Sequence, residues 1–164
     1  MKAISILQPW ASLVAVGAKK IETRSWATKY RGPLAVHASA RMSRKQKKVC
    51  WTNPFFKILE TAGLMEREVD GKHLNLLPVG AIIATCSLVD CVKIVGRTSV
   101  EGRIVAAQLE NRQVVEGDEL VFGDYTPGRF AWILEDVQPL PEPIPTKGML
   151  GLWEWQPLEG VKLT

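Results

Sequence analysis

The longest strand pattern of the chain covers residues 81–95 (AIIATCSLVDCVKIV), and it constrains the fold more than any other segment. Its β-branched side chains favour an extended backbone. The run is longer than an ordinary strand, so we expect one bent strand or two successive ones. Shorter apolar runs at residues 3–7, 34–38 and 130–134 are also typical of strands. The sequence therefore predicts a sheet of short strands around one long segment.

Two helical regions are expected in the N-terminal half. Pro9 suits the first position of a helix, where its missing N–H has no cost, and apolar residues follow it at helical spacing as far as Gly17. A basic helix is expected over residues 43–49, with Ser43 as its cap. Helical spacing resumes over residues 56–62. Strands with early helices predict an α+β fold with a curled sheet or small barrel.

The remaining segments carry weaker patterns. Residues 65–77 are polar and are expected to form a loop, whereas residues 104–109 could form a short helix. Residues 120–122 are expected to be a strand, and residues 137–145, with four of the ten prolines, an extended segment. No repeat, low-complexity tract or linker interrupts the chain. We therefore expect one domain over residues 1–164.

Composition places the chain among globular proteins. Of its 164 residues, 46% are hydrophobic and 23% are charged. Apolar runs are too short to span a bilayer and residues 1–7 are too short for a secretory leader, so we expect a cytoplasmic protein without a membrane partner. The three cysteines lack the spacing of a disulfide framework or zinc site. We expect no metal and no cofactor, since glycine-rich phosphate loops and hydrolase motifs are also absent from the sequence.

Residues 17–26 (GAKKIETRSW) concentrate charge in a short strand pattern. Alternation places Lys20, Glu22, Arg24 and Trp26 on one face of this strand, and Lys19 lies in the preceding turn. A carboxylate, two ammonium groups and a guanidinium can bind a phosphate or polarise a carbonyl. An exposed strand with an internal ion pair would have the same pattern, so both interpretations remain open.

Basic residues extend beyond this strand. Between positions 19 and 48 the chain has ten basic residues and a single acid, Glu22, and therefore carries +9. Because the whole chain carries +4, the remainder carries −5. This asymmetry predicts a basic face that binds a polyanion, although a solvated basic helix is the simpler alternative.

These residues resemble a known family. The spacing Gly17-x-Lys19-x-x-Glu22-x-Arg24 is similar to the G-x-K-x-x-E-x-R signature of the ASCH domain (activating signal cointegrator homology). Further similar segments cover nearly the whole chain. They are residues 5–11 with the Gln8-Pro-Trp-Ala11 entry, Arg31-Gly-Pro33, Val36-His-Ala38, Gly123-Asp-Tyr125, residues 129–132, and Pro143-Ile-Pro145 with Lys147-Gly148 and Trp153. The resemblance implies a PUA-like fold, a small mixed β-barrel with flanking helices. It also implies a cleft beside the first helix for RNA or a modified nucleoside.

The activities implied by the resemblance are not uniform. Some ASCH proteins bind nucleic acid and one acts as a ribonuclease. Much smaller members deacetylate acetylated cytidine with a threonine nucleophile, and this chain has Glu22 at the matching position. Glu22 cannot replace that hydroxyl as an acylated nucleophile, although Lys19 matches the catalytic lysine. We therefore expect an RNA-preferring nucleic-acid-binding module. The alternatives are a hydrolase of RNA or a modified nucleoside, and a protein-interaction module of a transcription or translation regulator.

The candidate residues each have a structural alternative. Lys19 and Glu22 would be the catalytic pair of an enzyme; otherwise Lys19 is a turn residue and Glu22 pairs with Arg24. Trp10 could stack on a base or join the core, His37 could titrate or serve as a hydrogen-bonded barrel residue, and Gln8 could read a base or cap the helix. The candidate nucleic-acid or ligand contacts are Gln8, Trp10, Lys19, Lys20, Glu22, Arg24, Trp26, Arg31, His37, Arg44, Lys45, Lys47 and Arg129.

Overall fold

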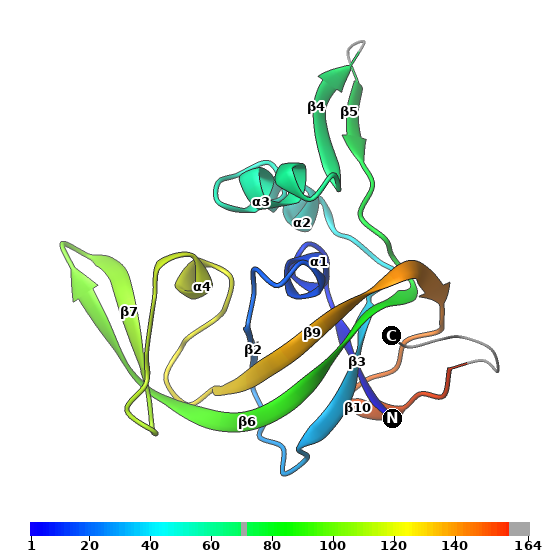
Figure 1. Ribbon diagram of the computed structural model, residues 1–164. Helices are drawn as coiled ribbons and strands as arrows, with labels where there is room; N and C mark the ends of the chain where they lie inside the picture. Colours follow the sequence, from blue (N-terminus) through cyan, green and yellow to red (C-terminus); the bar gives the residue numbers. More distant parts are fainter. Residues whose placement is uncertain (70–71, 158–164) are drawn as a thin grey trace. The chain divides into compact units, whose positions relative to one another are not determined.

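The computed structural model describes residues 1–69 and 72–157, which form mostly strands with a few short helices (Figure 1). The expectation of a mixed fold is therefore confirmed, whereas closure of the strands into a barrel stays a prediction. The chain forms two compact units. The first comprises Met1–Ala18, Pro33–Cys86 and Val137–Thr164, and the second comprises Lys19–Gly32 and Ser87–Asp136. The single domain over residues 1–164 also stays a prediction.

The first unit is built on β1 (Lys2–Ile6), which confirms the strand expected near residues 3–7. This strand pairs in parallel with β3 (Gly32–Ala38) and antiparallel with β10 (Leu152–Glu154). On the other side of β3 lies β6 (Ala81–Val100), the long segment of the sequence pattern, which continues into the second unit. Ala3, Ala35, Ile82, Trp153 and Trp155 form a buried cluster on this sheet.

Three helices of the first unit begin and end near the expected residues. They are α1 (Trp10–Ala15), α2 (Arg44–Val49) and α3 (Phe55–Thr61). Pro9 stands at the N-cap of α1, and Gly17 follows with a φ of 77°, a left-handed conformation that favours glycine. Helix α2 has a complete capping box: the Ser43 hydroxyl accepts from the Gln46 N–H, and the Gln46 side chain accepts from the Ser43 N–H.

The loop expected over residues 65–77 is wrong. This segment forms a hairpin of β4 (Met65–Val69) and β5 (Lys72–Asn75), and β4 lies beside α3 (Figure 1). The two strands pair with each other in a separate two-stranded sheet. Met65 is buried, whereas Glu66 is exposed. Antiparallel strands can keep one face in water and carry polar residues there, so polarity did not exclude a hairpin here.

The second unit contains β2 (Ile21–Arg24), which pairs antiparallel with the first residues of β9 (Phe130–Pro145). The end of β6 pairs with β7 (Arg103–Leu109), and β7 pairs with β8 (Val114–Glu116). A buried cluster between these strands includes Ile21, Ile94, Leu109, Val115 and Tyr125. The strand expected over residues 130–134 is therefore confirmed, and it continues through the proline-rich segment.

Two expectations for the second unit are wrong. Residues 104–109 belong to strand β7 because they have partners in both β6 and β8. Residues 120–122, expected as a strand, fall at the end of α4 (Gly117–Val121). Asp118 and Glu119 occupy the first turn of α4, where the helix dipole favours acidic side chains. No helix in the described part of the chain is long and apolar enough to span a membrane.

The capping box of α2 yields a stability prediction. Replacing Ser43 with alanine removes the acceptor for the Gln46 N–H and should lower the free energy of unfolding by about 1 kcal/mol. Urea titration followed by circular dichroism measures this loss. Ser25→Ala, at an exposed position of the other unit, is the control. An equal loss in both variants would contradict a specific capping role.

Candidate functional site

Lys19 is buried within the second unit, with only 1% of its side chain exposed. Its ammonium group donates to the Ile21 carbonyl oxygen. Two carboxylates lie nearby: Glu22 Oε2 is 3.6 Å from Lys19 Nζ, and Glu119 Oε1 is 4.0 Å from it. Lys19 is therefore neither a mobile cation nor a solvated turn residue. We refer to Lys19, Glu22 and Glu119 as the lysine cluster.

Glu119 fixes the start of β2 from almost a hundred positions away in the sequence. Its carboxylate accepts from the Lys20 N–H at 2.8 Å and from the Ile21 N–H at 3.2 Å. The Tyr125 hydroxyl also donates to it, at 3.4 Å. Burial raises the pKa of Tyr125, and the negative charge of Glu119 adds to this effect, so the hydroxyl keeps its proton. Sequence reasoning missed Glu119, since its only signal was an acidic pair after Gly117.

The Glu22–Arg24 face of β2 combines charged and aromatic groups. Glu22 Oε1 lies 3.1 Å from Arg24 Nε, and the antiparallel register puts Trp132 opposite Glu22 and Phe130 opposite Arg24. Residues directly opposite in a register share a face of the sheet. Trp26 meets the Trp132 ring edge-on, with centroids 4.7 Å apart. The expected alternation is confirmed, because Ile21 and Thr23 are buried on the other face.

The other candidates of the second unit differ in how they are held. Arg129 donates from Nε to the Asp124 carbonyl oxygen and lies 3.3 Å from the Asp124 carboxylate. Arg31 forms an ion pair with Asp90 at 2.8 Å and also donates to the carbonyls of Thr28 and Tyr30. The backbone of Lys20 is held by Glu119, while Lys20 itself is exposed. Arg129 is thus anchored to the loop that carries Asp124, and Arg31 to its own loop and to β6.

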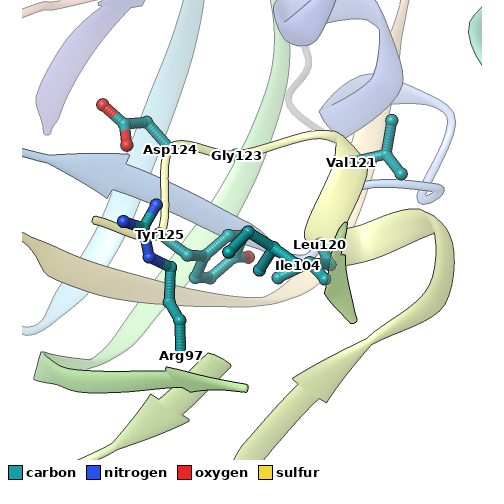
Figure 2. Close-up of a pocket in the computed structure, with 7 residues that line it drawn as sticks. All are labelled: Arg97, Ile104, Leu120, Val121, Gly123, Asp124 and Tyr125. Carbon is teal, nitrogen blue, oxygen red and sulfur yellow. The ribbon is translucent and has the colours of Figure 1, made fainter. Parts of the chain in front are cut away.

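Tyr125 also lines a cavity of about 230 Å³ (Figure 2). Arg97 reaches from its strand toward the loop that carries Asp124 and Tyr125. The Thr126 hydroxyl lowers the pKa of Asp124, with Arg129 and Arg97 adding to the effect, so this carboxylate is ionised. The remaining lining residues are Ile104, Leu120, Val121 and Gly123. The Gly123-Asp-Tyr125 segment noted in the sequence supplies part of the lining, but the sequence did not predict α4, which carries Leu120 and Val121.

Three candidates of the first unit, Gln8, Trp10 and His37, are held by internal contacts. Gln8 is fully buried: its Oε1 accepts from the Ser12 N–H, and its Nε2 donates to the Pro78 carbonyl oxygen at 2.7 Å. His37 is buried, with Nε2 2.9 Å from the Thr146 carbonyl oxygen and Nδ1 3.1 Å from Ser5 Oγ. Trp10 is partly exposed and meets Phe55 edge-on. Gln8 therefore supports the first turn of α1.

The sequence-predicted residues divide between the two units. The first contains Gln8, Trp10, His37, Arg44, Lys45 and Lys47, and the second contains Lys19, Lys20, Glu22, Arg24, Trp26, Arg31 and Arg129. Within the second unit the structure brings Glu22 and Arg24 together, and it packs Trp26 against Trp132, the residue opposite Glu22. Arg44, Lys45 and Lys47 are all exposed on α2.

Comparison with protein families gives a match to the ASCH domain over residues 4–144. The chain belongs to the ASCH domain family. This family is PUA-like and is generally associated with RNA binding. Activating signal cointegrator 1 from Homo sapiens is 34% identical over 89 residues, and its counterpart from Mus musculus is 33% identical over 89 residues. The matched region covers 54% of this chain but only 14% of each of these proteins.

The lysine cluster predicts a specific loss of stability in this ASCH protein. Lys19→Ala leaves two partly buried carboxylates, Glu22 and Glu119, without their shared cation. The free energy of unfolding should fall by about 3 kcal/mol, because removing one partner exposes the desolvation cost of the others. The matched control is Lys20→Ala, an exposed neighbour that should change stability by less than about 0.5 kcal/mol. Similar losses in the two variants, measured by urea denaturation, would contradict this role.

His37 predicts a dependence of stability on pH. Burial lowers the pKa of His37 from its usual 6.5, and the hydrogen bond with Thr146 only partly opposes this shift. The unfolded chain therefore binds a proton before the folded chain does, and stability is lost as pH falls below 6.5. Unfolding free energies at several pH values between 7.5 and 5.5 should show this decline. The decline should be smaller in His37→Gln; an unchanged profile would contradict the assignment.

Proposed function

We propose that this protein is a nucleic-acid-binding ASCH module that prefers RNA and takes one base or nucleotide at the Glu22–Arg24 face. The observation that carries the proposal is the register of β2 with β9, which gathers a carboxylate, a guanidinium and aromatic rings on one face. The proposal includes the closed β-barrel of PUA-like domains as the scaffold. The family's general association with RNA binding supports the same class of ligand.

Each group of this face has a suitable role toward a nucleotide. The Glu22 carboxylate can accept a hydrogen bond from the exocyclic amine of a base. Arg24 can bind a phosphate through two nitrogens or stack on a base. Trp26 and Phe130 are partly exposed aromatic residues and can stack on the base ring. A base with an exocyclic amine next to a phosphate therefore matches this face.

Lys19 acts in this proposal as a positioning residue. Its buried ammonium donates to the Ile21 carbonyl and lies beside the carboxylates of Glu22 and Glu119. It therefore orients the Glu22 side chain. A hydrolase that used Lys19 as its reactive group would need this nitrogen to reach the substrate. Because Lys19 is buried, its nitrogen is not accessible to a substrate, and this favours a binding module over a hydrolase.

The proposal predicts that Arg24→Ala weakens binding of a labelled single-stranded RNA by about tenfold, because a phosphate or stacking contact is lost. Fluorescence anisotropy over a series of salt concentrations measures the dissociation constant. For the wild-type protein, log affinity should fall with log salt by roughly 0.7 for each phosphate contacted. Arg103→Ala removes an exposed arginine from β7 and is the matched control.

Two results would contradict the proposal. The first is an affinity independent of salt, because phosphate contacts release counterions. The second is equal binding by the Arg24→Ala variant and the wild-type protein. Glu22→Gln adds a test of base choice: its affinity should fall more for RNA rich in cytosine and adenine than for uracil-only RNA, which lacks the exocyclic amine.

A further inference from the structure

Helix α2 has a buried side and a strongly basic outer side. Gln46 and Cys50 are four positions apart, face the interior of the first unit and are buried. The four cationic side chains of the helix are all exposed: Arg44, Lys45, Lys47 and Lys48. Helical spacing places Arg44 and Lys48 in one row along the outer side. The helix therefore presents its positive charge outward as a compact patch.

Helix stability does not account for all of this charge. Lys47 and Lys48 lie in the last turn, where the helix dipole favours cations. Arg44 and Lys45 lie in the first turn, which contains no acidic residue and where the dipole disfavours cations. Over residues 41–61 the chain has six basic residues and one acid. Among the described residues, no ion pair joins the four α2 cations to a carboxylate.

Trp51 adds an aromatic ring next to this patch. The helical backbone continues through Cys50, and the Trp51 N–H donates to the Lys48 carbonyl oxygen at 3.1 Å. Trp51 is partly exposed, and its ring stacks on the buried Phe56 with centroids 5.3 Å apart and planes 26° apart. This stack holds the indole in one orientation, so a base that stacks on it loses less conformational entropy of the protein.

We propose that the α2 face, formed by Arg44, Lys45, Lys47, Lys48 and Trp51, is a second nucleic-acid contact that selects single strands. The cations bind phosphates, and the Trp51 ring takes an unpaired base. In a duplex the bases are paired and stacked on one another, so only the phosphates can reach this surface. The inference rests on the proposed function and adds to it the strand type and a site on the first unit.

The test compares single-stranded and duplex RNA of about 12 nucleotides, a length suited to single-strand binding surfaces. Trp51→Leu should weaken single-strand binding by about tenfold and leave duplex binding unchanged. Trp51→Tyr, which keeps an aromatic ring, should restore most of the affinity. The double variant Arg44→Ala/Lys48→Ala should weaken both and reduce the salt slope for the single strand by about 1.4. Lys93→Ala/Arg103→Ala removes the same two residue types from exposed positions of the second unit and is the control.

A photo-crosslink keeps the test independent of whether Trp51→Leu folds. Wild-type protein is irradiated with a bromouridine-containing single strand, and the crosslinked peptide is identified by mass spectrometry. A crosslink at Trp51 supports the inference, and crosslinks found only outside the α2 face overturn it. Single-strand binding that is unchanged in the α2 variants but weakened by Arg24→Ala overturns this inference alone. Failure of every RNA to bind the wild-type protein overturns the proposed function as well.

Discussion

The arrangement of the second unit depends on the buried ammonium group of Lys19. It donates to the Ile21 carbonyl and lies within 4.0 Å of carboxylate oxygens from Glu22 and Glu119. A charge removed from water is tolerated in a protein only when it is paired and hydrogen-bonded. Each partner here has a second function: Glu119 holds the N–H groups that start β2, and Glu22 pairs with Arg24. A single buried cation therefore links the α4 helix to the charged face of β2.

This linkage holds the side chains of the Glu22–Arg24 face in fixed positions. Glu22 lies between Lys19 and Arg24, so its carboxylate is held from two sides. Opposite it in the register, Trp132 is fully buried, and Trp26 packs against the Trp132 ring. A ligand would therefore meet groups already held in position, which reduces the entropy lost on binding. The basic α2 face belongs to the other unit and is organised differently, by its capping box and by the Trp51–Phe56 stack.

Much of the fold was predictable from local patterns. Short apolar runs located β1 and β3, and the β-branched side chains located β6. The turn and cap residues Gly17 and Ser43 marked helix boundaries. Two of the errors arose because strand pairing, which a local pattern does not show, decided the structure. Residues 104–109 contain two alanines and one polar residue, Gln108, which suit either state, and strand partners on both sides decided the outcome. The β4–β5 hairpin was missed because its strands pair with each other, and their polar sequence does not show that pairing.

The sequence by itself determined which residues alternate on β2, where the basic residues concentrate, and that the chain resembles ASCH domains. These properties follow from neighbours in the chain, whose geometry is set by backbone periodicity. Only the tertiary structure decided the direction of Lys19, the role of Glu119 and the burial of Gln8. The sequence alone was compatible with Lys19 either as a reactive group or as a turn residue. The buried environment includes the carboxylate of Glu119, which lies 99 positions beyond Lys20. No local sequence pattern encodes a contact at that separation.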